Sequence, residues 1–137
     1  MRTIKISNER PPQWILNAVQ DLFNVEWESG VVFTYGDLIT TFHGKMREDL
    51  MHHEPVHSRQ QKEFGGAEQW WEEYLVNKEF RFEQELEAYR AQYKWIMQNE
   101  KQRQWFKYLE AYANDLSGDM YGNLITKSNA MKAINSY

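Results

Sequence analysis

Residues 53–57 read His-Glu-Pro-Val-His, an instance of the pattern HExxH. On a helix, side chains four positions apart lie on one face, so the imidazoles of His53 and His57 can reach one metal ion. Glu54 then lies beside the open position of that metal, where its carboxylate can take a proton from an attacking water. The spacing predicts a Zn2+ site with His53 and His57 as ligands and Glu54 as the general base.

Two features of this motif weigh against the metal. A five-residue pattern also arises by chance, and the alternative is an exposed helix face that carries two idle histidines. In addition, Pro55 lies inside the motif, and a proline in a helix interior costs about 3 kcal/mol. We therefore expect the helix to begin late, near Met51 or His52, so that Pro55 falls in its first turn, or to kink there.

A catalytic zinc needs a third protein ligand, and the glutamates of residues 83–87 are the candidates. On a helical wheel, Glu85 lies at the margin of the apolar stripe, whereas Glu83 and Glu87 lie on the flank beside small alanines. Small residues allow two helices to approach closely. We therefore expect Glu87 to be the third ligand, with Glu83 in reserve. The alternative is that both carboxylates form surface ion pairs within their own helix.

Tyr121 lies in a turn next to Gly122, near the C-terminus. Peptide hydrolysis places negative charge on the oxygen of the scissile carbonyl, and a hydroxyl donor can stabilise that charge. We therefore interpret Tyr121 as a candidate catalytic residue. The alternative is a tyrosine packed at a turn.

The elements that must position these residues follow from hydrophobic periodicity and from glycine and proline positions. A short strand is expected at residues 3–7, followed by a helix that starts within 8–12. Residues 31–35 and 38–42 resemble a pair of strands around Gly36-Asp37. Helices are expected at about 49–64, around 70–75, at about 78–98 and around 105–116, with a last short helix capped by Thr126 or Ser128. The fold class is therefore α+β: one domain over residues 1–137, with a small N-terminal sheet before a mostly helical part.

Composition excludes several other classes of protein. The chain has 137 residues, of which 42% are hydrophobic and 15% aromatic, enough for one core. The net charge of −4 makes nucleic acid a poor partner, and the absence of cysteine excludes thiolate ligands and disulfides. No signal peptide or membrane span is evident, so the expected location is cytoplasmic or virion-associated.

The segment HEPVHSRQQ, followed by a tryptophan-rich stretch and then ELEAYRAQ, resembles the short gluzincin-type zinc metallopeptidases of bacterial and phage genomes. The resemblance covers about residues 31–134 and implies a minimal zincin-like domain. The positions that carry it are His53, Glu54, His57, Gln60, Gln61 and the Glu87-Ala88 pair. One departure is Ala91, where many gluzincins have an acidic residue, so support for a ligand histidine is expected from Gln60, Gln61 or a backbone carbonyl.

The function expected from motif and resemblance is a zinc-dependent peptidase acting on an extended polypeptide. Residues 31–35 would hold the substrate backbone as an added strand. The alternative is a non-catalytic zincin-fold protein that acts in structure or interaction, with an assembly partner, for example in a phage particle. A peptidoglycan hydrolase using the same zinc chemistry ranks third.

Overall fold

The computed structural model describes residues 3–136 and has the expected α+β architecture. Strand β1 (Lys5–Ser7) and helix α1 (Gln13–Phe23) come first, and strands β2 (Phe33–Tyr35) and β3 (Leu38–Thr40) follow. The helical part comprises α2 (Glu54–Phe64), α3 (Ala67–Val76), α4 (Lys78–Asn99), α5 (Gln102–Leu116) and α6 (Lys127–Asn135). Short 3-10 turns lie at η1 (Trp27–Ser29), η2 (Glu48–His52) and η3 (Asp119–Tyr121).

The small sheet has the strand order β1-β3-β2. β1 runs parallel to β3, and β2 pairs with β3 in an antiparallel hairpin in which Tyr35 lies opposite Leu38. Gly36 in the two-residue turn has a φ of +63°, a conformation that glycine adopts without strain. β2 therefore lies at one edge of the sheet, and α2 packs next to it.

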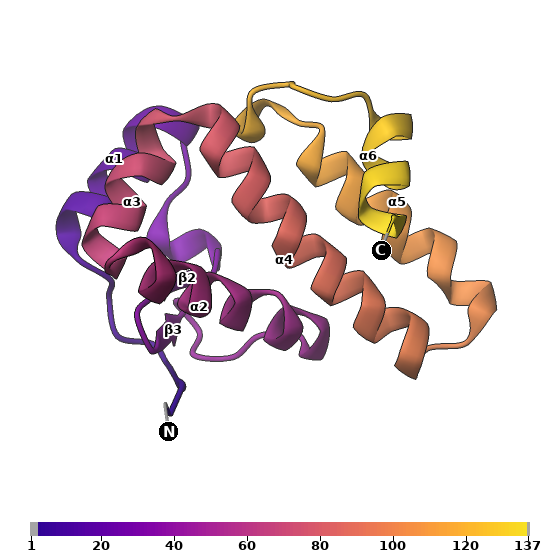
Figure 1. The fold of residues 1–137 in the computed structure, drawn as a ribbon. Helices are drawn as coiled ribbons and strands as arrows, with labels where there is room; N and C mark the ends of the chain where they lie inside the picture. Colours follow the sequence, from indigo (N-terminus) through magenta and orange to yellow (C-terminus); the bar gives the residue numbers. More distant parts are fainter. Residues whose placement is uncertain (1–2, 137) are drawn as a thin grey trace.

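Helix α4 crosses the molecule between two groups of elements (Figure 1). On one side lie α1, α3, α2 and the sheet, and on the other lie α5 and α6. Each group has its own cluster of buried apolar side chains. The first is centred on Ile15, Val19, Phe33, Trp70 and Trp71, and the second on Ile96, Leu109, Leu116, Ala130 and Ile134. The long middle helix therefore buries side chains toward both groups.

The start of α2 explains how a proline fits into the HExxH segment. The 3-10 turn η2 ends at His52, His53 is the N-cap residue, and α2 begins at Glu54. Pro55 is thus the second helical residue, where no intrahelical N–H bond is lost. The predicted late start is confirmed.

The other expected elements are found close to their predicted positions. The predicted break at Gly65-Gly66 ends α2, because Gly65 takes a φ of +111°. The last helix, α6, is capped by Thr126, whose hydroxyl accepts from the backbone N–H of Asn129. Among residues 3–136, none of the helices is long and apolar enough to cross a membrane.

Candidate metal centre

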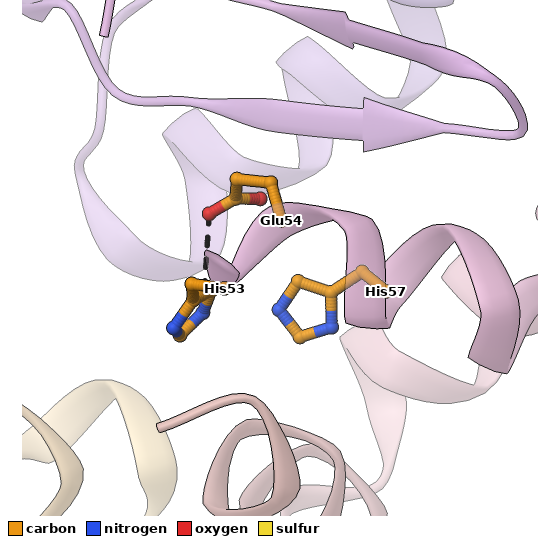
Figure 2. A group of neighbouring side chains, drawn as sticks. All are labelled: His53, Glu54 and His57. Atoms are coloured by element: carbon orange, nitrogen blue, oxygen red, sulfur yellow. Dashed lines mark ion pairs between the residues drawn. The ribbon is translucent and has the colours of Figure 1, made fainter. Parts of the chain in front are cut away.

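The N-terminal turn of α2 brings His53, Glu54 and His57 together in the interior. All three side chains are buried, and one potential ligand atom from each lies within 4.8 Å of the others. Figure 2 shows the two imidazoles side by side on one side of the helix, with Glu54 turned toward the β2–β3 hairpin. The ring centres of the two histidines are 5.0 Å apart. This group could hold a metal ion.

Helix α4 adds a fourth buried side chain to the group. Oε1 of Glu85 lies 2.9 Å from Nε2 of His53 and 3.0 Å from Nε2 of His57. Its other oxygen, Oε2, accepts a hydrogen bond of 2.5 Å from the hydroxyl of Tyr74. Tyr74 thus anchors one oxygen of Glu85, while the other faces both imidazoles.

The far nitrogen of His57 is held by the side-chain amide of Gln60. The amide nitrogen of Gln60 donates to the main-chain oxygen of Gln84 (3.0 Å) and to Oε1 of Glu87 (2.8 Å). Both of these partners only accept, so Oε1 of Gln60 must face Nδ1 of His57, 2.8 Å away. Nδ1 of His57 therefore carries the proton and donates it to Gln60.

His53 is held in the same way by an amide from α4. Nδ1 of His53 lies 2.9 Å from Oε1 of Gln92, whose amide nitrogen donates to Asp49 (2.8 Å). The Gln92 oxygen is thereby directed at His53. In their neutral forms, both histidines then present the lone pair of Nε2 toward the same carboxylate oxygen of Glu85.

Two nitrogen lone pairs and a carboxylate oxygen in close contact repel one another unless a cation lies among them. In the metal-free protein a proton fills this role. Burial alone would lower the pKa of His57, but the charge and hydrogen bond of Glu85 outweigh burial and raise it to about 9. Burial likewise disfavours the charged form of Glu85, yet the two histidines lower its pKa well below the ordinary value.

The same three groups could hold a metal ion in place of the proton. Two imidazole nitrogens and one carboxylate oxygen form a ligand set found in catalytic zinc sites, which leave a further position open. His53, His57 and Glu85 offer this set from two helices packed against each other. The hydrogen bonds from Nδ1 of each histidine to a side-chain oxygen are the usual means of orienting such ligands.

Glu54 lies beside this set without forming part of it. Its Oε1 accepts a hydrogen bond of 3.0 Å from the hydroxyl of Thr34 on β2, and its Oε2 lies 3.8 Å from Nε2 of His53. Burial raises the pKa of Glu54, and this outweighs the opposing influence of the histidines and of Thr34. A buried carboxylate with a raised pKa, fixed in position beside the two histidines, takes up a proton more readily than an ordinary carboxylate.

A cavity of about 400 Å³ adjoins the four side chains. His53, Glu54, His57 and Glu85 line one part of it, and apolar and aromatic side chains line much of the rest. Tyr121 from η3 also lines the cavity. Burial raises its pKa well above the ordinary value, and its hydroxyl is hydrogen-bonded to that of Tyr89. Tyr121 therefore remains protonated beside the cavity.

The structure does not bring Glu87 to the histidines. The prediction that this side chain lies against them is wrong. Its half-exposed carboxylate is paired with Arg59 and accepts from Gln60. Glu83 is exposed on the same helix. The physical reason is that α4 turns its 85–92 face, rather than its 83–87 flank, toward the start of α2.

Sequence reasoning also missed the polar side chains on the buried face of α4. Arg81, Glu85 and Gln92 lie four and seven positions apart and are all buried. The available signal was that charged and amide side chains recur at helical spacing among the core residues of this helix. Such a pattern indicates a buried polar group of side chains, because buried polar groups need specific partners. Glu85 had been placed at the margin of the apolar stripe, which is close to its observed position.

Comparisons with known proteins identify no relative. No family model, no curated protein and no solved structure matches this chain. The resemblance to gluzincin-type metallopeptidases stays a prediction.

Proposed function

We propose that this protein is a zinc-dependent peptidase that hydrolyses peptide bonds of an extended polypeptide. The observation that carries the proposal is that Nε2 of His53 and Nε2 of His57 both lie within 3.0 Å of Oε1 of Glu85, beside a fixed and buried Glu54. Taken singly, each of these side chains could serve only to stabilise the fold. Together they form a site with three ligands and a general base.

His53, His57 and Glu85 would hold the ion. When bound, zinc supplies Lewis-acid chemistry, since it polarises a carbonyl and lowers the pKa of water to about 7. Zinc is the metal we propose because imidazole and carboxylate ligands in this number suit it and because the site is buried.

Glu54 is the proposed general base and then the general acid. Its carboxylate accepts a proton from the attacking water, whose oxygen adds to the scissile carbonyl carbon. When the carbon–nitrogen bond breaks, Glu54 returns the proton to the leaving nitrogen. The products are a carboxylic acid and an amine, which then exchange a proton to give a carboxylate and an ammonium. The hydrogen bond from Thr34 keeps one oxygen in place, which leaves the other free for the proton.

Tyr121 is the proposed donor to the oxyanion. Tyr121 lines the same cavity as Glu54, and burial keeps its hydroxyl protonated. The hydroxyl can therefore stabilise the negative charge that develops on the carbonyl oxygen.

The edge strand β2 constrains how a substrate backbone can bind. Tyr35 and Leu38 flank the hairpin turn, so the backbone groups of Thr34 point away from β3. The carbonyl of Thr34 already accepts from the side chains of Gln61 (2.7 Å) and Trp71 (2.8 Å). This part of the edge is therefore covered.

The segment before β2 is a better docking place for the substrate. Gly30, Val31 and Val32 line the cavity next to the metal centre. Gly30 already donates to the main-chain oxygen of Trp27 and accepts from the hydroxyl of Thr41. We therefore propose that the substrate backbone pairs with residues 31–32, which narrows the segment 31–35 expected from sequence. The aromatic wall provided by Trp70 and Trp71 favours a substrate with a bulky apolar side chain close to the scissile bond.

The experiment that tests the function compares wild-type protein with Glu54→Gln, both stripped with chelator and reloaded with zinc. Each is incubated with an unfolded protein and with a mixed peptide library, and new termini are identified by mass spectrometry. We expect cleavage by the wild type next to apolar residues and a rate lower by about 10²–10⁴ in the variant. Equal zinc content in both proteins is the control. A zinc-loaded wild type that cleaves neither substrate would contradict the proposal.

A further inference from the structure

Asp49 is a buried carboxylate that does not contact a proposed ligand. One side chain, that of Gln92, lies between Asp49 and His53. Asp49 lies in η2, just before α2, and its side chain is only 7% exposed. Its Oδ2 accepts from the amide of Gln92 (2.8 Å) and from the hydroxyl of Tyr112 (2.8 Å). Arg47 adds bonds of 3.0 Å to Oδ1 and 3.3 Å to Oδ2. Four donor atoms thus converge on one carboxylate: two from Arg47, which precedes η2, one from α4 and one from α5.

Burying a charged group costs desolvation free energy, and at Asp49 the hydrogen bonds from its partners offset that cost. Burial alone would raise the pKa of Asp49, but the hydrogen bonds from Arg47, Tyr112 and Gln92 outweigh burial and lower it. Asp49 is therefore ionised and can only accept hydrogen bonds. An asparagine of the same shape would have to place a donor group against these donors.

The acceptor-only character of Asp49 has a consequence for His53. Because Asp49 accepts from the nitrogen of the Gln92 amide, the oxygen of that amide must face Nδ1 of His53. Nδ1 must then donate, and Nε2 of the neutral ring must present its lone pair toward Glu85. Asp49 thus determines which way the Gln92 amide is oriented, and the orientation of this amide determines the tautomer of His53.

We propose that Asp49 is a positioning residue that sets the tautomer and orientation of His53 through Gln92. The proposal rests on the proposed function only in that His53 is taken as a metal ligand. The sequence analysis expected support for a ligand histidine from Gln60, Gln61 or a backbone carbonyl, and at His53 the proposal assigns this support to Gln92 and Asp49. The Gln92 amide spans the gap between the histidine and the carboxylate.

The arrangement at His57 provides a matched comparison. There the Gln60 amide donates both to the carboxylate of Glu87 and to the main-chain oxygen of Gln84. Loss of the Glu87 charge leaves the main-chain acceptor in place, so Gln60 keeps its orientation. Glu87→Gln and Asp49→Asn therefore both remove a carboxylate that is separated from a histidine by one amide side chain. We expect only Asp49→Asn to change the orientation of that amide.

The test is the ring-nitrogen NMR spectrum of metal-free protein, recorded over a pH series that extends to alkaline pH, where the imidazoles are neutral. In the wild type we expect His53 to carry its proton on Nδ1 throughout. In Asp49→Asn the Gln92 amide can turn over, and we expect His53 to become a mixture of both tautomers. In Glu87→Gln we expect the His53 signals to match those of the wild type.

A second readout is the zinc dissociation constant measured by competition with a chelator. We expect Asp49→Asn to weaken zinc binding by about 10–100-fold. A wild-type His53 protonated on Nε2 would overturn the proposal without any variant, as would a folded Asp49→Asn with the wild-type tautomer. If the wild type binds no zinc, the proposed function fails, and the metal-free spectra still decide the role of Asp49.

Discussion

Oε1 of Glu85 lies 3.0 Å from Nε2 of His57, although the two residues are 28 positions apart in the chain. The contact is buried, and the far side of each partner is held, Glu85 by Tyr74 and His57 by Gln60. Such a contact needs a shared cation, which is a proton in the metal-free protein and zinc in the function that we propose.

Replacing Thr34 with valine removes the hydrogen bond to Glu54 and nearly keeps the shape of the side chain. A hydrogen bond to a charged group contributes about 1.5–3 kcal/mol, so we expect kcat for peptide cleavage to fall by about tenfold or more. Because this bond lowers the pKa of Glu54, its loss raises that pKa further. The acid limb of the pH–rate profile should therefore move to higher pH, with zinc content unchanged. An unshifted profile would show that Thr34 does not hold the working carboxylate.

Tyr121→Phe removes the hydroxyl that we assign to the oxyanion. Loss of one such donor typically lowers kcat by about 10²–10³, and we expect a value in this range with little change in KM. Steady-state kinetics on one cleaved peptide measures both constants. Tyr121 also packs in the core, so thermal unfolding of the variant is the control. Wild-type kcat in a folded variant would leave Tyr121 with a packing role only.

The stability of the metal-free protein should depend on pH through His57. Its pKa rises from the ordinary 6.5 to about 9 in the folded state, so the folded state binds this proton more tightly than the unfolded chain. The resulting stabilisation is fully present below about pH 6.5 and is lost as the pH rises through about 9. We expect the Tm of metal-free protein to fall by several degrees over this window.

The control for that prediction is metal-free His57→Gln, which lacks the titrating group. Its Tm should change less between the same two pH values, as followed by circular dichroism. An equal pH dependence in both proteins would mean that another group is responsible.

Much of the fold was predictable because local signals agree with tertiary packing. Gly65 ends α2, the Gly36-Asp37 turn joins β2 to β3, and Thr126 caps α6, each by a mechanism confined to a few residues. Pro55 indicated that α2 begins late, although its first residue is Glu54 rather than Met51 or His52. These features depend on neighbours in sequence, which a single chain displays directly.

The third carboxylate could not be chosen in the same way. Helix α4 packs on α2 and α3 with one face and on α5 and α6 with another, so its pattern does not reveal one buried side. Whether Glu85 or Glu87 faces the histidines depends on the rotation of α4 about its own axis. That rotation is set by packing against four other helices, and the flanking alanines were a weak guide to it. By contrast, the relation of His53 to His57 lies within one helix turn and needed no tertiary information.

The most direct test of the central claim is the zinc content of wild-type protein, Glu85→Gln and Glu87→Gln, measured by elemental analysis after chelator washing and reloading. The two variants make the same substitution two positions apart on one helix, and unfolding curves show whether each is folded. We expect about one zinc per chain in the wild type and in Glu87→Gln, and little or none in Glu85→Gln. A wild type that takes up no zinc, or a Glu85→Gln protein that holds it as tightly as the wild type, would contradict the account.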